Sequence, residues 1–421
     1  MAEIKEFKGM MYDSDIVGNL ASVVAPHCHA AEEETIRSLY SAHPFNIVRL
    51  EYPVSKTDKE DKYVCAANTL EKWLETGIVR IDEQPGIYVY EQQYKLGNDT
   101  KRVRGIIAKV KIEEDIILPH ENTNTDIYDD YKSNRYNLMQ ATGTSFSSIY
   151  SMYRDDDGAV AELLVMKTNA AVEFEDNFGI IHRVWAITEK ERINAIKELF
   201  ENKKLVIADG HVRYETAVSY RNKMKGEVVE YTGNEDFNYC LMNLVPVGKD
   251  TPTVKAVHRL LKNRQLFDET DLLTKLEGSF NIEKSYIREY DCEKIENRLA
   301  EHKEQHAMGM YTGKDYYYIL TPKNGIADGI NTDVQLLHKE ILEKLFGINK
   351  NNYKSYIDHA ASIHDGEQAV REGKANCAFY LNPLSAGELY KMAECGICVP
   401  KRTNSFYPRL MMGIIMNKFD E

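Results

Sequence analysis

Two segments near the start of the chain have the apolar pattern of paired strands. Residues 86–91 and 103–112 are rich in β-branched and aromatic side chains, and Gly97-Asn98 between them is a typical hairpin turn. Residues 66–77 place apolar side chains at helical spacing and end at a glycine, which predicts an amphipathic helix. The first part of the chain is therefore expected to contain substantial sheet.

The pattern changes from strand to helix within a short central stretch. Residues 203–208 end in a short apolar run of strand type, and Asp209-Gly210 follows as a typical tight turn. Apolar positions then recur at helical spacing until Gly226, a plausible helix stop. We therefore expect a strand, a tight turn and a helix in direct succession.

The remaining pattern mixes strands and helices without a repeat or a low-complexity linker. Strands or extended segments are expected at 16–20, 23–26, 47–50, 149–153, 163–166, 182–187, 239–247, 308–311, 316–320 and 378–383. Helices are expected at 32–40, 137–142, 188–200, 271–276, 293–305, 333–345 and 385–393. This pattern and the length of 421 residues predict an α+β (mixed α/β) protein of two lobes, residues 1–260 and 261–421.

Charge and composition narrow the function classes. The net charge of −13 disfavours an extended nucleic-acid or anionic-membrane surface, although a local pocket can still bind a small anion. Apolar runs fall short of the roughly 18 residues of a membrane span, and the amino terminus lacks a signal-peptide core. Seven cysteines fit reduced thiols. We therefore expect a cytoplasmic protein, monomeric or homodimeric, with small-molecule substrates.

The turn at Asp209-Gly210 is the main candidate for chemistry. Glycine lets the backbone approach a ligand, and the helix amino terminus attracts anions. His211 and Arg213 add donors, and the Asp209 carboxylate can hold Mg²⁺ or accept a proton. The alternative is an ordinary turn with solvated or Glu-paired side chains.

Two further stretches in the first half carry suitable groups. His120, Glu121 and Thr123 place a potential base beside donors in a proline-stiffened loop. Thr144, Ser145 and Ser147 lie in a glycine- and hydroxyl-rich turn that suits phosphate oxygens or a serine ligand, although such clusters commonly just mark loops.

Basic residues elsewhere are weaker candidates. Arg49 and the pair His258-Arg259 could reach an oxyanion or pair with acidic residues. Residues 399–409 form a proline-bounded loop that could close over a polyanion, or be a solvated turn. Its candidate ligands are Lys401, Arg402, Thr403 and Ser405.

Three of these stretches resemble one family. Residues 207–216 are similar to the signature Ile-Ala-Asp-Gly-His-His-Arg-Tyr-Glu-Thr of a family long filed as a domain of unknown function, whose members include pyrophosphate-dependent L-serine kinases. Residues 118–123 and 400–409 resemble its Leu-Pro-His-Glu-x-Thr and Pro-Lys-x-Thr-x-Phe-x-Pro-Lys segments. The chain departs from the family at Val212, where the signature has its second histidine, and at 27–29, where His-Cys-His replaces Pro-Tyr-Asp.

The core of the signature also resembles the phosphate-binding turn of ADP-dependent serine kinases, which implies a core like that of ParB and sulfiredoxin. The resemblance implies Mg²⁺-assisted transfer of a phosphoryl group from pyrophosphate to the L-serine hydroxyl, giving O-phospho-L-serine and phosphate. Asp209 or Glu121 would be the base, with His211 beside them, and the hydroxyl and basic residues above would bind the substrates. An ADP- or ATP-dependent serine kinase, and a ParB-like nucleotide-binding regulator without turnover, remain the alternatives.

Overall fold

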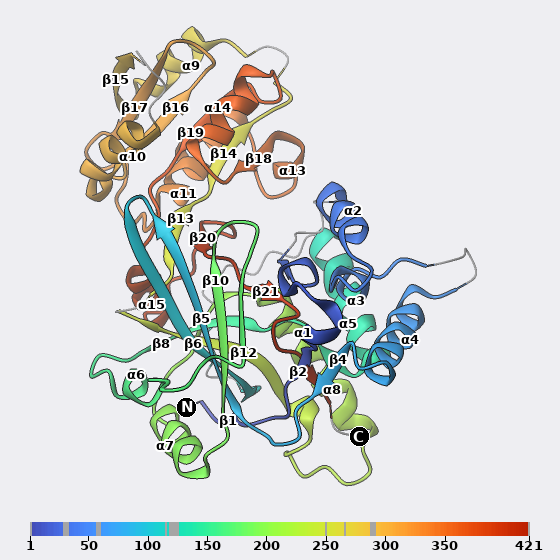
Figure 1. Cartoon of the computed structure of the whole chain (residues 1–421). Helices are drawn as coiled ribbons and strands as arrows, with labels where there is room; N and C mark the ends of the chain where they lie inside the picture. Colours follow the sequence, from blue (N-terminus) through green and yellow to red (C-terminus); the bar gives the residue numbers. More distant parts are fainter. Residues whose placement is uncertain are drawn as a thin grey trace. The chain divides into compact units, whose positions relative to one another are not determined.

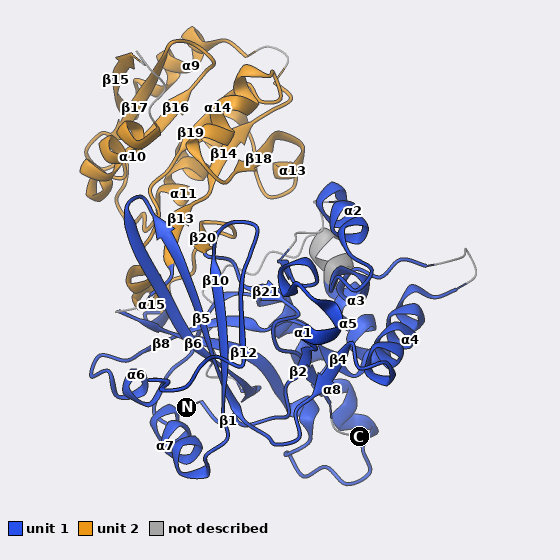
Figure 2. Ribbon diagram, viewed as in Figure 1, with its two compact units in different colours: residues 1–252, 393–395, 408–421 blue, residues 253–392, 396–407 orange. Residues whose placement is uncertain are grey.

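The structure is a computed structural model that describes residues 2–27, 33–55, 60–113, 116–117, 126–248, 251–264, 267–286 and 292–419, with the side chains of 126–131 excepted. Its contacts divide into two compact units (Figure 2). Unit 1 holds residues 1–252, 393–395 and 408–421, and unit 2 holds 253–392 and 396–407. The sequence predicts the boundary between the lobes at residue 260, and in the structure unit 1 first ends at Pro252. Residues 408–421, at the carboxyl terminus, also belong to unit 1.

Unit 1 contains a large mixed sheet (Figure 1). Among the described residues, its strands run in the order β11 (Val206–Asp209), β8 (Ile149–Arg154), β12 (Tyr239–Val247), β6 (Asp99–Lys111), β5 (Ile87–Leu96), β10 (Ile181–Ile187) and β9 (Val172–Glu175), and β1 (Ile4–Lys5) also pairs with β6. The β8–β12 pairing is parallel and the other pairings are antiparallel. The hairpin expected around Gly97-Asn98 is confirmed as β5 and β6.

Alternate residues of this sheet form one apolar core. Ile87 and Val89 of β5 and Ile106, Ala108 and Val110 of β6 are buried together on one face. Helices that contribute to this core include α7 (Lys190–Phe200), through Ile193, Ile196 and Phe200, and α8 (His211–Glu227). Strict alternation of this kind fixes the strand register, because a slip of one residue would expose the whole set.

The other elements of unit 1 are short helices and two-stranded ladders. The helices are α1 (Ser14–Val17), η1 (Leu20–Ser22), α2 (Glu33–Ala42), α3 (Val48–Glu51), α4 (Lys62–Glu75), α5 (Asp126–Thr142), α6 (Ala159–Leu163) and η2 (Asp236–Asn238). The ladders pair β2 (Met10–Tyr12) with β4 (Val79–Ile81), β21 (Met411–Met412) with β3 (Ala25–Pro26), and β22 (Asn417–Lys418) with β7 (Thr144–Ser145). The carboxyl-terminal strands thus pair with segments from early in the chain.

Unit 2 is built on an antiparallel sheet that is buried on both faces. Its order is β15 (Phe280–Tyr286), β17 (Tyr316–Pro322), β16 (Met308–Tyr311), β19 (Cys377–Tyr380), β14 (His258–Leu261) and β18 (Ile357–Ala360). Cys377 and Phe379 enter one apolar core, whereas Ala378 and Tyr380 enter a second. Period-two alternation between two apolar faces is what a sheet between two helical layers requires.

Helices of unit 2 supply both cores. One core takes residues of α9 (Glu269–Leu276), α11 (Asp333–Leu336) and the π-helix η4 (Leu337–Glu343), and the other takes residues of α10 (Cys292–Glu301) and α14 (Ile363–Arg371). The remaining elements are η3 (Lys303–Gln305), α12 (Lys344–Phe346), α13 (Tyr353–Tyr356), α15 (Ala386–Glu394) and the ladder of β13 (Thr253–Ala256) with β20 (Asn404–Tyr407).

The mixed α/β class is confirmed, while three extended segments were predicted wrongly. Residues 47–50 belong to α3, because the Asn46 side chain accepts the Val48 N–H and starts the turn. In 16–20, Ile16 and Val17 end α1 and Leu20 begins η1 for a similar reason, since the side chain of Asp13 caps α1 and that of Asn19 caps η1. In 163–166, Leu163 ends α6 and the rest is irregular, because Asp155 accepts two N–H groups of the first turn of α6. In each case, side-chain hydrogen bonds to N–H groups at the start of a helix override β propensity.

Candidate functional site

The strand, turn and helix expected around Asp209 are present. Strand β11 pairs with β8 and is bulged between Ile207 and Asp209, so that Asp209 stands opposite Tyr150. Ile117 pairs with Val206 along the same strand. Helix α8 begins at His211, directly after Gly210. Its amino terminus therefore lies at the end of a strand held by neighbours on either side.

Gly210 makes this junction possible. Its φ of 96° lies in the left-handed region, and a Cβ there would stand 3.0 Å from the Arg213 Nε. Its N–H donates to the Asp209 carboxylate at 2.7 Å, and its carbonyl accepts the Tyr214 N–H at 3.0 Å. Asp209 is exposed. The turn thus presents a carboxylate at the positive end of a helix of 17 residues.

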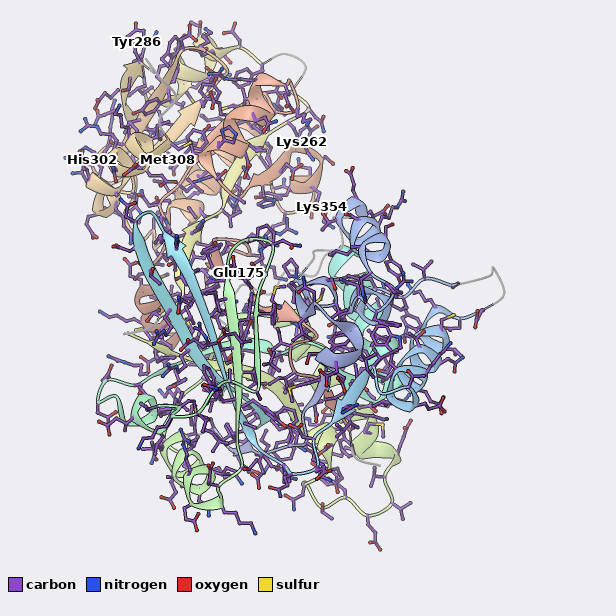
Figure 3. All side chains as sticks on the ribbon, in the orientation of Figure 1. Glu175, Lys262, Tyr286, His302, Met308 and Lys354 are labelled. Carbon is purple, nitrogen blue, oxygen red and sulfur yellow. The ribbon has the colours of Figure 1, made fainter. Side chains whose placement is uncertain are left out.

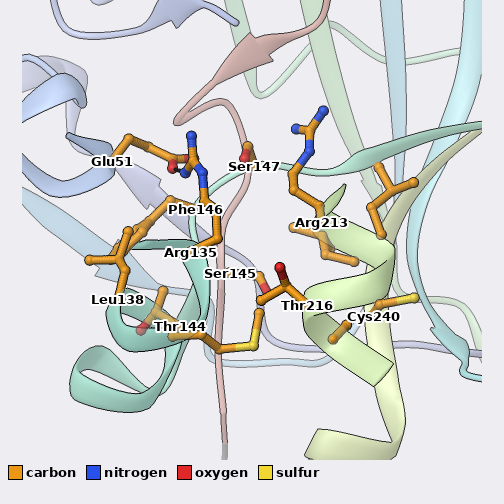
Figure 4. Close-up of a pocket in the computed structure, with 14 residues that line it drawn as sticks. Glu51, Arg135, Leu138, Thr144, Ser145, Phe146, Ser147, Arg213, Thr216 and Cys240 are labelled. Carbon is orange, nitrogen blue, oxygen red and sulfur yellow. Dashed lines mark ion pairs between the residues drawn. The ribbon is translucent and has the colours of Figure 1, made fainter. Parts of the chain in front are cut away.

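A cavity of about 40 Å³ lies beside the first two turns of α8 (Figure 4). A single water needs only about 10–15 Å³, so a few waters or a small polar group can occupy it. We call it the α8 cavity. Its lining residues are Glu51, Arg135, Leu138, Met139, Thr144, Ser145, Phe146, Ser147, Ile149, Arg213, Thr216, Ala217, Cys240 and Leu241.

Arg213 provides a cation at this cavity. Its Nη1 donates to the Ser148 carbonyl at 2.9 Å. Among the described residues, the structure shows no salt bridge between Arg213 and a carboxylate. Ser147 lies between Arg213 and Arg135 in Figure 4. A guanidinium tethered by one carbonyl keeps further N–H donors for an oxyanion.

The hydroxyl groups at the cavity fall into two kinds. Thr144 donates to the Thr142 carbonyl at 2.9 Å, and Thr216 donates to the Val212 carbonyl at 2.7 Å. Ser145 and Ser147 are only half-buried, and the structure shows no side-chain hydrogen bond for either among the described residues. The two serines are therefore better placed than the threonines to donate to a ligand.

The turn at 143–147 is held by the end of the chain. The strand β22 pairs with β7, the Phe419 N–H donates to the Gly143 carbonyl at 2.8 Å, and the Gly413 N–H donates to the Phe146 carbonyl at 3.1 Å. The Phe419 ring also contacts Tyr220 of α8, with 5.8 Å between centroids. One carboxyl-terminal segment thus contacts both α8 and the serine-rich turn.

Arg135 and Glu51 form a buried ion pair in the cavity wall, and sequence reasoning missed both. Their relative exposures are 7% and 4%, and Figure 4 shows them side by side. The Arg135 guanidinium also stacks over the Tyr52 ring, 5.0 Å from its centroid. The available signal was Arg135 at helical spacing with Leu138 and Met139, which places a cation in an apolar stripe.

Burial keeps two other groups near the site neutral. It raises the pKa of the Tyr150 hydroxyl well above its usual range, and the Asp209 charge nearby adds to the shift. Burial likewise raises the pKa of the Cys240 thiol. Since the thiolate is the reactive form, Cys240 is not placed to act as a nucleophile.

The Mg²⁺ expected here would have the Asp209 carboxylate as its candidate ligand, because Glu51 in the cavity wall is paired with Arg135. Asp209 is exposed at the turn, and the described residues contain no group of three or more side chains that could hold a metal. Magnesium commonly takes one or two carboxylates together with substrate phosphates and water. The residues present therefore fit an ion held by Asp209 and the substrate.

Other candidates of unit 1 lie elsewhere or outside the described residues. Arg49 on α3 donates to the Tyr40 carbonyl at 2.7 Å and covers the Tyr40 ring at 4.9 Å. His211 is half-buried at the first position of α8. His120, Glu121 and Thr123, like Cys28 and His29, lie outside the described residues.

The remaining candidates belong to unit 2. His258 is buried, and its Nδ1 accepts the Leu381 N–H at 3.2 Å. Arg259 donates to the Arg402 and Lys401 carbonyls at 3.1 and 3.4 Å. The Thr403 hydroxyl is buried and donates to the Pro400 carbonyl at 2.6 Å, and Ser405 lies on β20 opposite Lys255. The structure therefore gathers the basic loop around Arg259.

Comparisons with known proteins give a family match. The family described as "Protein of unknown function (DUF1015)" matches residues 4–345. A comparison with curated proteins gives no match. Within the described residues, none of the helices has both the length and the apolar character to cross a membrane.

Several solved structures show a distant likeness. A conserved hypothetical protein from Pyrococcus furiosus is 11% identical, with a TM-score of 0.36, and the match covers 72% of this chain and 92% of that one. A free serine kinase in complex with AMP is 9% identical, with a TM-score of 0.35, and the match covers 72% of this chain and 87% of that one. SbnI with a C-terminal truncation from Staphylococcus aureus is 9% identical, with a TM-score of 0.34, and the match covers 73% of this chain and 85% of that one.

Identities this low leave the chemistry to be argued from the residues themselves. The family match, in contrast, runs through both units and includes the turn, α8 and the serine-rich segment. The chain belongs to the DUF1015 family of proteins of unknown function.

Proposed function

We propose that this protein is a phosphotransferase that moves a phosphoryl group from pyrophosphate to the hydroxyl of free L-serine, giving O-phospho-L-serine and phosphate. One observation carries the proposal. Arg213, in the first turn of the helix that follows Gly210, has no carboxylate partner among the described residues and lines a small cavity edged by serine hydroxyls. Helix N–H groups, a guanidinium and hydroxyls are the donors that phosphate oxygens need.

The donor is proposed to be pyrophosphate. Its oxygens would accept from the Arg213 guanidinium, the first N–H groups of α8, and the Ser145 and Ser147 hydroxyls. The small cavity suits a phosphoryl group. Val212, which replaces the second histidine of the motif, supports a donor without a nucleoside. The basic loop residues Lys401, Arg402, Thr403 and Ser405 stay further candidates for pyrophosphate contacts.

For phosphoryl transfer, the protein mainly has to position the two substrates and to neutralise the negative charge of the phosphoryl oxygens. Phosphoryl transfer is stabilised by cations on the equatorial oxygens, and Arg213 supplies one. The proton of the serine hydroxyl must pass to a base, and Asp209 and Glu121 are the candidates. Mg²⁺ bound by Asp209 would supply further positive charge for the pyrophosphate oxygens. His120 directly precedes Glu121 and His211 lies two residues after Asp209, and both are candidate donors.

Phosphorus NMR tests this function directly. The purified protein receives Mg²⁺ and L-serine, with pyrophosphate, ADP or ATP in separate tubes. The expected result is an O-phosphoserine resonance with pyrophosphate alone. Product with a nucleotide only would move the donor, and no product in any tube from folded protein would contradict the proposal.

A further inference from the structure

A second cationic group lies wholly within unit 2. We call Arg259, His338, Tyr353, His359 and Arg402 the Arg259 cluster. They come from β14, η4, α13, β18 and the loop before β20, respectively. The Tyr353 ring is 5.3 Å from that of His338 and 6.1 Å from that of His359, and the Arg402 Nη1 is 3.2 Å from the His359 Nδ1. These contacts join side chains far apart in sequence.

Arg259 is the centre of the cluster, and it is fully buried, with 0% relative exposure. Its guanidinium donates to three carbonyls, those of Val257 at 2.7 Å, Arg402 at 3.1 Å and Lys401 at 3.4 Å. Within the described ranges it makes no salt bridge, and its Nε has no hydrogen-bond partner. The free-energy cost of burying a full charge without a counter-ion is large, and carbonyl dipoles offset only part of it.

The groups around Arg259 act on its charge in opposite directions. Burial lowers the pKa of the guanidinium, the contact with the Tyr353 hydroxyl raises it, and the Arg402 charge lowers it. Burial and the Arg259 charge lower the pKa of His338 to about 3, and the same causes lower that of His258 to about 3. Both imidazoles are therefore neutral at pH 7, as expected for buried groups beside a cation.

His338 and Arg402 carry separate signs of a binding site. The His338 Nε2 is shielded from solvent and has no hydrogen-bond partner among the described residues. His338 lies on a π-helix, a rare conformation that is frequent at functional sites. Arg402 is exposed and has a φ of 57°, a left-handed conformation that is unfavourable for a non-glycine residue.

We propose that the Arg259 cluster binds an oxyanion of the phosphate class. The buried Arg259 guanidinium would contact the anion from the interior of unit 2. The exposed Arg402 guanidinium would contact it from the solvent side. The imidazoles of His338 and His359 and the Tyr353 hydroxyl would supply further hydrogen bonds. Two guanidinium groups match the charge of a phosphate dianion better than that of a carboxylate.

This inference deepens the proposed function, because it names a place where pyrophosphate or the product phosphate binds. It is tested by binding rather than turnover, so the two can fail separately. The intact protein with ¹⁵N-labelled histidine is titrated with orthophosphate, pyrophosphate and acetate. The His338 and His359 resonances are assigned with the variants His338→Gln and His359→Gln. Saturable shifts of both resonances with the phosphates, and not with acetate, are expected.

Variants locate the binding. Arg402→Gly removes the cation and relieves the left-handed backbone, and it should weaken phosphate binding roughly tenfold or more without lowering the melting temperature. Lys354→Ala is the matched control, because Lys354 is an exposed cation of neighbouring α13 (Figure 3), and binding should change less than about twofold. Arg213→Ala in unit 1 should leave these shifts in place.

Three results would overturn the inference. They are the absence of a saturable shift at His338 and His359, equal shifts with acetate, and unchanged phosphate binding by Arg402→Gly. Any of them would leave Arg259 as a structural arginine that ties the 400–402 loop to β14. Loss of turnover with binding intact would instead count against the proposed reaction alone.

Discussion

Two buried arginines, one in each unit, differ in the groups that surround their positive charge. Arg135 in the wall of the α8 cavity is paired with the Glu51 carboxylate. Arg259 in unit 2 is at least as buried, yet its partners are backbone carbonyls, a tyrosine hydroxyl and another cation. The charge of Arg135 is balanced by a carboxylate, whereas the described residues provide no carboxylate for Arg259. The comparison teaches that burial alone does not distinguish a structural arginine from a candidate for anion binding, and that the partner of the guanidinium is the feature to examine.

The two histidines next to charges in unit 2 repeat this contrast. His306 shares a hydrogen bond of 2.8 Å with Asp333, and this contact raises its pKa. Burial, together with the Arg259 charge, lowers the pKa of His338 to about 3. The two imidazoles are thus favoured in opposite protonation states by burial and by the charge of the neighbouring side chain.

The largest expected effect comes from removing the carboxylate of Arg135. Glu51→Gln removes the charge of the carboxylate that pairs with the buried Arg135, and should cost about 3–5 kcal/mol of unfolding free energy. Chemical denaturation measures it. The double variant Glu51→Gln/Arg135→Met should recover most of the loss. A Glu51→Gln protein as stable as the wild type would break the comparison.

The next effect concerns turnover. Asp209→Asn retains the oxygen that accepts the Gly210 N–H but removes the charge, so the turn should persist while phosphoserine formation falls roughly 10³-fold, about 4 kcal/mol. Phosphorus NMR measures the rate. Asp156→Asn, in an exposed turn, is the control and should keep the wild-type rate. Near-normal turnover by Asp209→Asn would leave Glu121 as the remaining candidate base.

A smaller effect is expected from the backbone of the same turn. Gly210→Ala forces a left-handed alanine and places its Cβ against Arg213, at an expected cost of about 1–2 kcal/mol. Gly226→Ala is the matched control, because nothing lies near its Cβ and its φ is ordinary. If Gly210→Ala matched the control in both melting temperature and turnover, the turn would not position Arg213.

The smallest effect is the pH dependence of the His306–Asp333 pair. Because the folded pKa of His306 is raised, its contribution is fully present below the unfolded value of about 6.5 and is lost as pH rises through the folded pKa. His306→Asn suits the φ of 55°. The melting-temperature difference from the wild type should be larger at pH 6 than at pH 9. A difference independent of pH would contradict the assignment.

The sequence predicted correctly the parts of the site that are formed by residues adjacent in the chain. The apolar run, Asp209-Gly210 and the helical spacing after it lie within one short stretch, so pattern alone predicted β11, the turn and α8. The error at 47–50 was also local in origin, because the cap that Asn46 makes is invisible to β propensity. Turn and cap chemistry decides such short segments.

The rest of the site depends on pairings between distant residues. Glu51 meets Arg135, and β22 at the end of the chain pairs with β7, and neither pairing leaves a periodic trace in the sequence. Arg259 was recognised as a cation, but the lack of a described carboxylate beside it is a property of the folded unit. Long-range partners of this kind are what local pattern cannot supply.

The measurement that tests the central claim most directly is the rate of phosphoserine formation by wild type, Arg213→Ala and Arg213→Lys, followed by phosphorus NMR with pyrophosphate and L-serine. We expect a loss of roughly 10²–10³-fold for Arg213→Ala and a partial recovery for Arg213→Lys, because lysine restores charge without the guanidinium fork. Lys223→Ala, on the same helix, should keep the wild-type rate. Equal rates for wild type and Arg213→Ala would show that the amino terminus of α8 is not where the phosphoryl group is held.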